Sequence, residues 1–323
     1  MHRFRTTTFI IILTAWLAGI AATDAALPPG IKLLKDLPYV TDGTPAQKLD
    51  LYFPVDMSGP KRPLVVWIHG GGWSAGSKSG VPILALLSHG YCVASVEYRF
   101  SQVAIFPAQI QDCQAAIRWL RAHADEYHLD GDHFGVGGDS AGGHLSLLVG
   151  MTGGKNIFPK IGGNDAQSDR VQAVCDFYGP ADFNTVLDQF AHQQTPSGFR
   201  FNGGDPYSRL IGTPLGSDAT KAEAVSPVHY VSADVPPVLI LHGTRDPLVP
   251  FAQSEELLAD LRQAKVDALL QHFPGAGHGG RIFHSAAAQQ LVQNFFDNHL
   301  LGKDVKVELL PDSQVTLPSP TTR

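Results

Sequence analysis

The spacing of apolar and polar residues predicts two kinds of strand in this chain. Residues 47–53 alternate apolar and polar positions, which is the period of a strand with one buried face. Three other stretches are continuous apolar runs next to glycine or proline, and these are 64–68, 91–96 and 238–241. Such runs are typical of strands buried on both faces, so we expect a sheet that is covered on both sides.

Apolar residues at helical spacing predict three long helices. They recur every three or four positions from Pro107, a residue suited to a helix start, to about Tyr127. Two further helices are predicted over 255–264 and 286–300, and Gly302 ends the second of them. Strands that alternate with helices indicate an α/β fold with a mostly parallel central sheet and helices on both faces. Functional groups in such folds gather beyond the carboxyl ends of the strands.

Two segments lack a sustained period. Residues 184–226 are rich in Gly, Pro, Gln and Ser, and a loop that long inside a compact domain is usually functional. We interpret it as a cap-like insertion over the functional site. Residues 303–323 form a tail that we expect to dock loosely or fray. A length of 323 residues allows one or two domains, and the order of the motifs favours one domain over 26–302.

The N-terminus has the pattern of a secretory signal. A positively charged leader over residues 2–5 precedes an apolar run over 9–20, and small residues follow. The run is shorter than the roughly 20 residues that span a bilayer, so stable membrane insertion is not expected. We predict a signal peptide over 1–25, cleaved after Ala25 or alternatively after Ala21, and export to the periplasm or beyond. An uncleaved membrane anchor is the competing interpretation.

Charge and cysteine content exclude several classes of partner. The chain has 24 Lys and Arg against 30 Asp and Glu, a net charge of −6, and no basic run that would indicate nucleic-acid binding. Neither C-x-x-C nor H-E-x-x-H spacing occurs, so no metal site is predicted. Cys92, Cys113 and Cys175 have apolar neighbours and are interpreted as core residues, with a Cys92–Cys113 disulfide left open. The oligomeric state is not predicted.

A Gly-x-Ser-x-Gly sequence over 138–142 predicts a reactive serine. In the nucleophile elbow, a serine occupies a strained turn between a strand and a helix, and the flanking glycines avoid collisions there. A short strand over 133–137 precedes Ser140, and apolar residues after it indicate a helix whose N-terminal dipole favours negative charge. The five-residue pattern alone is weak, because a glycine-rich turn with an incidental serine has the same letters.

A second glycine cluster, His69-Gly70-Gly71-Gly72-Trp73, directly follows the apolar run 64–68. Glycines let backbone N–H groups converge on one point, as an acyl-transfer oxyanion requires. We assign the N–H groups of Gly71, Gly72 and Ala141 as the oxyanion hole.

Two other glycine motifs do not match these clusters. A phosphate-binding loop needs Lys directly after its second glycine, whereas Ser77 separates Gly76 from Lys78. A dinucleotide fingerprint needs glycine at the position of Ser140.

A serine nucleophile needs a histidine base and a carboxylate that orients the base. This kind of sheet imposes the chain order Ser, Asp, His. Asp246 lies just past the run 238–241, and His278 lies in a glycine-rich loop before the last predicted helix. We therefore predict a triad of Ser140, Asp246 and His278.

The chain has 14 histidines, so the competitors need a reason for exclusion. His242 and His284 are interpreted as structural, His69 as shaping the glycine loop and His144 as a packed core residue. Asp234 precedes its strand and Asp260 lies within a predicted helix, which puts both away from the site.

These motifs in this order resemble the α/β-hydrolase fold, and specifically the HGGG-type esterases related to hormone-sensitive lipase. The resemblance covers roughly residues 31–300 and is strongest to the bacterial group named for bifunctional feruloyl and acetyl-xylan esterases. The words that carry it include DFYGPADF, SPVHYV, PPVLILHGTRDPLVP and GAGHGG. Residues 184–226 are not matched, and substrate specificity would be decided there.

The motifs and the resemblance together predict a serine carboxylesterase without a cofactor, acting on short-acyl, acetyl or feruloyl esters through an acyl-enzyme. Trp73, Phe177 and Tyr178 are candidate walls of an acyl pocket, although aromatic residues beside strands are equally typical of a core. A serine peptidase or amidase on the same fold and a non-catalytic binding protein are the alternatives. The natural acyl and alcohol groups are not predicted.

Overall fold

A computed structural model describes residue 27 and residues 29–199 and 203–315 of the chain. The predicted signal peptide, the last residues of the tail and residues 200–202 lie outside this part. Eight strands form one sheet in the order β1-β2-β4-β3-β5-β6-β7-β8. Their bounds are β1 Ile31–Pro38, β2 Lys48–Pro54, β3 Arg62–Ile68, β4 Cys92–Val96, β5 Leu129–Asp139, β6 Ala173–Phe177, β7 Val238–Gly243 and β8 Ala268–Phe273.

The sheet is mostly parallel. The pairs β1/β2 and β2/β4 are antiparallel, and every neighbouring pair from β4 to β8 is parallel. All residues of β4, β6 and β7 are buried, because helices cover both faces of the sheet. The predicted α/β class with a parallel central sheet is confirmed.

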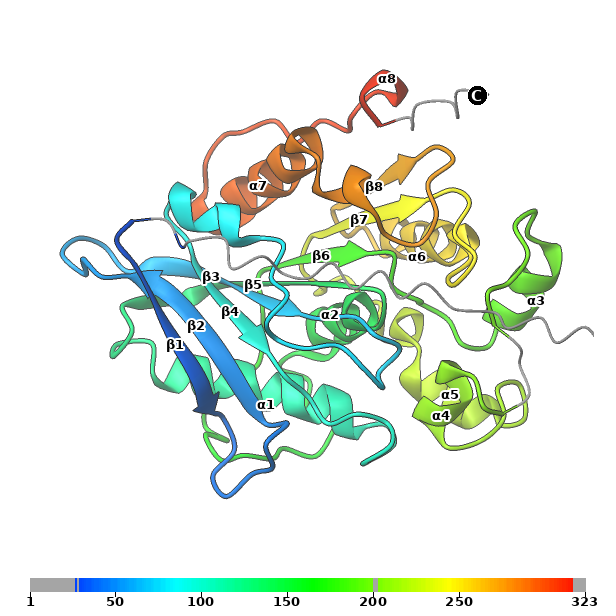
Figure 1. Ribbon diagram of the computed structural model, residues 1–323, viewed down its shortest axis with the longest axis horizontal. Helices are drawn as coiled ribbons and strands as arrows, with labels where there is room; N and C mark the ends of the chain where they lie inside the picture. The colour runs from blue at the N-terminus through cyan, green and yellow to red at the C-terminus, as the bar shows by residue number, and fades with distance from the viewer. Residues whose placement is uncertain (1–26, 28, 200–202, 316–323) are drawn as a thin grey trace, which may run out of the picture.

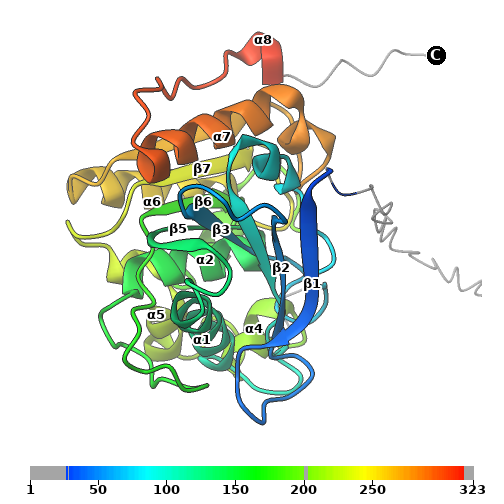
Figure 2. The same cartoon turned by 90° about the vertical axis from the view of Figure 1, so that its left-hand side faces the viewer.

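Two layers of helices enclose the sheet. Helices α1, α2 and α6 pack on one face, and α7 with the short 3-10 helix η1 packs on the other (Figures 1 and 2). The helices are α1 Ala108–Ala122, α2 Ala141–Thr152, α3 Val186–His192, α4 Pro206–Ile211, α5 Ala219–Val225, α6 Phe251–Gln263, α7 Ala286–Leu301 and α8 Asp312–Val315. The 3-10 helices are η1 Leu84–His89, η2 Pro227–Tyr230 and η3 Arg281–His284. Within the described residues, the structure contains no helix with the length and apolar character of a membrane span.

The segment 184–226 contains three short helices, α3, α4 and α5, which gather on one side of the molecule (Figure 1). It contacts two loops at the carboxyl ends of strands. The Tyr207 ring packs against Trp73 at 5.6 Å between ring centres, and the Tyr207 hydroxyl donates to the Leu248 carbonyl at 3.1 Å. The Gly198 N–H donates to the Pro247 carbonyl at 2.7 Å. The segment therefore joins the glycine loop after β3 to the loop after β7.

The tail docks on the sheet edge as far as the structure describes it. The Leu310 N–H donates to Gln271 Oε1 in β8 at 2.6 Å, and Val315 in α8 is fully buried. The predicted helix from Pro107 to Tyr127 is shorter than expected, because α1 ends at Ala122 and turns lead from there into β5.

Candidate active site

Ser140 occupies a strained turn between β5 and α2. Its φ is +55°, a conformation that costs energy for any residue with a side chain. The Ser140 N–H donates to the Phe177 carbonyl at 2.7 Å, which ties the turn to the end of β6. A Cβ atom on Gly142 would lie 2.0 Å from the Ile68 carbonyl oxygen, so only glycine fits beside the turn.

The structure brings Ser140, His278 and Asp246 together in one hydrogen-bonded chain. His278 Nε2 lies 2.8 Å from Ser140 Oγ, and His278 Nδ1 lies 2.6 Å from Asp246 Oδ2. The three residues follow three different strands, β5, β8 and β7. Their spacing along the chain is long, but the parallel sheet places all three strand ends on one edge.

The Asp246 carboxylate is nearly inaccessible and receives N–H groups on both oxygens. Oδ1 accepts the backbone N–H of Leu248 at 2.7 Å and of Val249 at 2.9 Å, and Oδ2 faces His278 and His242. Burial raises the pKa of Asp246, but hydrogen bonds from His242 and His278 outweigh burial and hold the pKa below its usual range. The group is therefore a carboxylate at neutral pH.

The backbone N–H groups of Gly71, Gly72 and Ala141 lack acceptors among the described residues. No described residue accepts a hydrogen bond from Gly71 or Gly72, and Ala141 is the first residue of α2, where intrahelical acceptors are absent. Gly71 and Gly72 have φ values of +117° and +59°, and a Cβ on Gly71 would lie 2.2 Å from the Ala75 carbonyl oxygen. The loop conformation thus requires glycine at this position.

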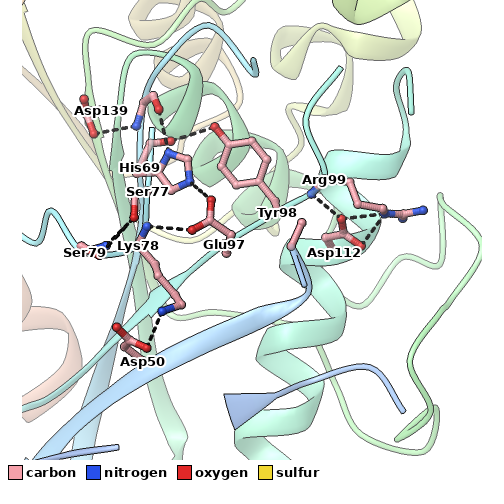
Figure 3. Close-up of polar contacts among 12 residues, drawn as sticks. Asp50, His69, Ser77, Lys78, Ser79, Glu97, Tyr98, Arg99, Asp112 and Asp139 are labelled. Carbon is pink, nitrogen blue, oxygen red and sulfur yellow. Dashed lines mark hydrogen bonds and ion pairs between the residues drawn. The ribbon is translucent and has the colours of Figure 1, made fainter. Parts of the chain in front are cut away.

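Asp139 connects the serine turn to the glycine loop. Its Oδ1 accepts the Gly70 N–H at 3.0 Å, and a Cβ on Gly70 would lie 2.6 Å from its other carboxylate oxygen (Figure 3). Burial raises the pKa of Asp139, against the opposing effect of the Gly70 hydrogen bond. Asp139, the residue before the nucleophile, therefore helps to fix the position of the glycine loop relative to the Ser140 turn.

Glu97, which follows β4, holds both ends of the same loop (Figure 3). Its Oε1 lies 3.1 Å from His69 Nε2, and its Oε2 accepts the Lys78 N–H at 3.2 Å. His69 Nδ1 is 2.7 Å from the Gly70 carbonyl, and the Tyr98 hydroxyl donates to the His69 carbonyl at 3.0 Å. His69 therefore shapes the glycine loop, as the sequence predicts.

The three aromatic residues predicted as pocket walls have different positions. Trp73 is 2% exposed, and its indole N–H donates to His144 Nδ1 at 3.2 Å, so it supports the glycine loop from within the core. Phe177 is equally buried and borders one end of a cavity. The Tyr178 ring packs edge-on against the His278 ring at 4.7 Å between centres. Tyr178 is thus the member of the set whose side chain packs against the predicted triad, whereas Phe177 contacts Ser140 through its backbone carbonyl.

Two cavities adjoin these elements. One of about 240 Å³ lies between η1 and α7 and includes Phe177 and His284 in its wall. The other, of about 600 Å³, lies between α3 and the start of α6 and is bordered by Asp246, Arg245 and polar side chains of α3. Among the described residues, no group of three His, Cys, Asp or Glu side chains is arranged so that it could hold a metal ion.

Three polar residues that support the site, Asp139, Glu97 and His242, have little or no signal in the sequence. Asp139 carries a local signal, because it lies inside the Gly-x-Ser-x-Gly motif. Glu97 and His242 have no local sequence signal beyond their place at the ends of apolar runs, because the residues that they contact are not in a shared motif.

Comparison with known families matches most of the chain to one model. The family model described as BD-FAE matches residues 49–261, and the model described as TAP-like protein matches residues 216–307. Among curated proteins, the chain is 32% identical over 238 residues to the probable carboxylic ester hydrolase LipM of Mycobacterium tuberculosis. That match covers 72% of this chain and 53% of LipM. Esterase LipC of the same organism is 32% identical, with 75% of this chain and 59% of LipC covered. The chain thus spans little more than half the length of these relatives.

Solved structures with the same architecture include named esterases. A truncated carbohydrate esterase from gut microbiota superposes with a TM-score of 0.74 at 29% identity, covering 84% of this chain and 96% of that one. A bifunctional GH43-CE protein of Bacteroides eggerthii has a TM-score of 0.72 at 30% identity, covering 83% and 35%. The propionate-bound esterase of Thermogutta terrifontis has a TM-score of 0.62 at 26% identity, covering 85% and 94%.

Proposed function

This chain belongs to the BD-FAE family, and from that premise we propose that it is a serine carboxylesterase of the α/β-hydrolase fold. The observation that carries the proposal is the hydrogen-bonded chain from Asp246 through His278 to Ser140, with heavy-atom distances of 2.6 and 2.8 Å. Nucleophile, base and orienting carboxylate are within the reach that acyl transfer requires. The esterase names of the relatives and solved structures support the same reaction class.

The reaction takes place in two halves. In the first, Ser140 Oγ attacks the ester carbonyl while His278 Nε2 takes the hydroxyl proton, and His278 then returns that proton to the departing alcohol. In the second, His278 takes a proton from water, the resulting hydroxide oxygen attacks the acyl-enzyme, and Ser140 regains its proton as the acid leaves. The ionised Asp246 holds the proton of His278 on Nδ1 and stabilises the positive ring that forms in each half.

The carbonyl oxygen becomes negatively charged in both halves. The N–H groups of Gly71, Gly72 and Ala141 have no acceptor in the part of the chain that the structure describes and can donate to this oxygen, and the start of α2 adds its dipole. Preformed donors need no reorganisation at the moment of reaction, so this term is expected to contribute roughly 10²–10³ in kcat per donor.

For the substrate, we propose short-acyl esters, with acetyl and feruloyl esters of carbohydrates as the finer candidates. The likeness to a solved carbohydrate esterase supports a hydroxyl-rich alcohol group. The cavity beside Asp246 offers polar side chains of α3, among them Asp188 and Gln189, for contacts with such a group. A panel of p-nitrophenyl esters of increasing acyl length, acetylated xylan and methyl ferulate tests this choice. Turnover of an aminoacyl anilide with no ester turnover would contradict the reaction class.

The central test is Ser140→Ala, with Ser146→Ala as the matched control. Ser146 lies in α2, the helix that follows Ser140, and its hydroxyl donates to the Gly142 carbonyl without contacting His278. We expect Ser140→Ala to lower kcat on p-nitrophenyl acetate by about 10⁴-fold or more, because no other group forms the acyl-enzyme. A fluorophosphonate probe should label the wild type and the control only. Wild-type activity in Ser140→Ala with an unchanged circular-dichroism spectrum would show that Ser140 is not the nucleophile.

We also propose that the protein is exported, on the basis of the charged leader and the apolar run over residues 2–20. Expression of the full chain in a bacterium, followed by N-terminal sequencing of the exported protein, should give a new N-terminus at residue 26. A cytoplasmic product that retains residues 1–25 would contradict export.

A further inference from the structure

A second histidine contacts the predicted catalytic acid from inside the core. His242 is the penultimate residue of β7 and has no exposed surface. Its Nε2 atom lies 3.3 Å from Asp246 Oδ2 and 3.1 Å from the Val249 carbonyl oxygen. Its Nδ1 atom lies 2.6 Å from the hydroxyl of Ser254, a buried residue of α6.

These contacts determine where the proton of the ring lies. Both neighbours of Nε2, the Asp246 carboxylate and the Val249 carbonyl, are acceptors, so Nε2 must carry the hydrogen. Nδ1 then accepts a hydrogen bond from the Ser254 hydroxyl, which is able to donate. One neutral tautomer of His242 satisfies every polar atom around the ring, which is the requirement for a polar group without access to water.

We propose that His242 is a positioning residue for the ester hydrolysis proposed above, and that it fixes the Asp246 carboxylate for its bond to His278. The inference rests on that proposed function. The other donors to Asp246 come from its own loop, the N–H groups of Leu248 and Val249, and both go to Oδ1. Oδ2 is the atom that faces His278, and it is also contacted by His242. Because His242 lies in β7 and contacts Ser254 of α6, it connects Oδ2 to a strand and a helix.

The packing around His242 makes it a rigid support. The Phe251 ring lies edge-on at 5.5 Å between ring centres, and the Ser254 hydroxyl fixes the far side of the imidazole. His278, in contrast, lies on a glycine-rich loop, and its side chain is 15% exposed. A buried donor on a strand thus supports the carboxylate more rigidly than the loop that carries the base could.

Loss of the contact between His242 and Asp246 should affect the chemical step and not substrate binding. His242 is fully buried behind Asp246, so a substrate does not touch it. A displaced Asp246 orients His278 less well and stabilises its positive charge less in the transition state. The expected signature is therefore a lower kcat at an unchanged KM.

Two amide variants separate positioning from simple filling of the core. The amide nitrogen of glutamine reaches the position of Nε2, whereas that of asparagine reaches only the position of Nδ1. We expect His242→Gln to keep kcat on p-nitrophenyl acetate within about threefold of wild type, and His242→Asn to lose about tenfold or more at the same KM. Thermal unfolding of both variants shows that each one folds. Equal kcat values for the two folded variants would overturn the proposal.

A double-mutant cycle with Asp246→Asn adds a readout that a structural role would not move. We expect His242→Asn to cost little in the Asp246→Asn background, because the carboxylate that it positions is already absent. The same fold-loss in both backgrounds would contradict the inference. Activity that survives Ser140→Ala would instead refute the proposed function, so the two failures are distinguishable.

Discussion

At the scale of single residues, His144 shows how a buried polar side chain supports the glycine loop. It is fully buried in α2, its Nδ1 accepts the Trp73 indole N–H at 3.2 Å, and its Nε2 lies 2.7 Å from the Val225 carbonyl. The neutral ring with the proton on Nε2 satisfies both contacts. Burial lowers the pKa of His144 to about 4, although the hydrogen bond to Val225 acts against burial. The ring therefore links the loop after β3 to the end of α5 without carrying charge.

This shifted pKa predicts a stability loss in mild acid. The folded-state pKa of about 4 lies below the ordinary value of 6.5, so between these pH values the unfolded chain binds a proton that the folded chain does not. The His144 contribution is fully present above pH 6.5, falls as the pH decreases and is lost near pH 4. Its size is about 3 kcal/mol in the free energy of unfolding.

Urea unfolding of the wild type and of His144→Gln at pH 7 and pH 4.5 measures this effect. We expect the wild type to lose about 2–3 kcal/mol more than the variant on acidification, because glutamine does not titrate. His192→Gln is the matched control, since the His192 side chain is 75% exposed. An acid-induced loss of equal size in His144→Gln and wild type would contradict the prediction.

The residues of the site divide by whether their signal is local. Ser140, the glycines of 69–72 and His278 lie in short motifs whose letters already require a turn, so the sequence could place them at strand ends. The bond between Asp139 and Gly70 joins positions 69 residues apart, and Glu97 meets His69 across 28 residues. No periodicity or motif encodes such pairs, because only the order of strands in the sheet brings them together.

At the scale of elements, one glutamine of α6 is hydrogen-bonded to residues just before the 184–226 insertion and to the first residues within it. Gln253 is fully buried, and its Oε1 accepts the N–H groups of Ala181 and Asp182, both at 2.8 Å. Its amide nitrogen donates to Thr185 Oγ1 at 3.2 Å and to Gln189 Oε1 at 2.7 Å. The position of α3 over α6 therefore depends on a polar network and not only on apolar contact.

Gln253→Leu should destabilise the protein strongly. Leucine fills a similar volume but leaves the buried N–H groups of Ala181 and Asp182 without an acceptor, at a cost of about 1–3 kcal/mol each. Gln263→Leu, on the exposed end of the same helix, should change stability by less than about 0.5 kcal/mol. Urea unfolding of both variants gives the comparison, and equal midpoints would show that the network contributes nothing.

The elements that periodicity failed to reveal share a physical cause. The edge strand β1 is nowhere fully buried, and polar residues interrupt the apolar runs of β6, at Asp176, and of β8, at Gln271 and His272. Helices α3, α4 and α5 have six or seven residues, fewer than two turns, so a period of 3.6 cannot repeat within them. Strands β3, β4 and β7 were predictable because each is a continuous apolar run. Helices α6 and α7 were predictable because packing against the sheet imposes an apolar face on them.

At the scale of the whole molecule, the sheet divides the interior into two apolar cores, and all three cysteines lie in them. Cys92 and Cys113 belong to the core beneath α1 and α2, and Cys175 belongs to the core beneath α7. All three are free thiols. Burial raises the pKa of Cys92 to about 12 and raises the pKa values of Cys113 and Cys175 well above their usual range. The thiolate, which is the reactive form, is therefore suppressed at neutral pH.

The folded protein should consequently resist thiol reagents until it unfolds as a whole. We expect a chromogenic disulfide reagent at pH 8 to modify almost no thiol in the native protein and three thiols in denaturant, at a native rate set by global opening. A Ser79→Cys variant supplies a positive control, because residue 79 is exposed. Reductant should leave the thermal midpoint unchanged, since no disulfide closes a loop. Fewer than three thiols in denaturant without reductant would reveal a disulfide, and rapid native labelling would show that a core opens locally.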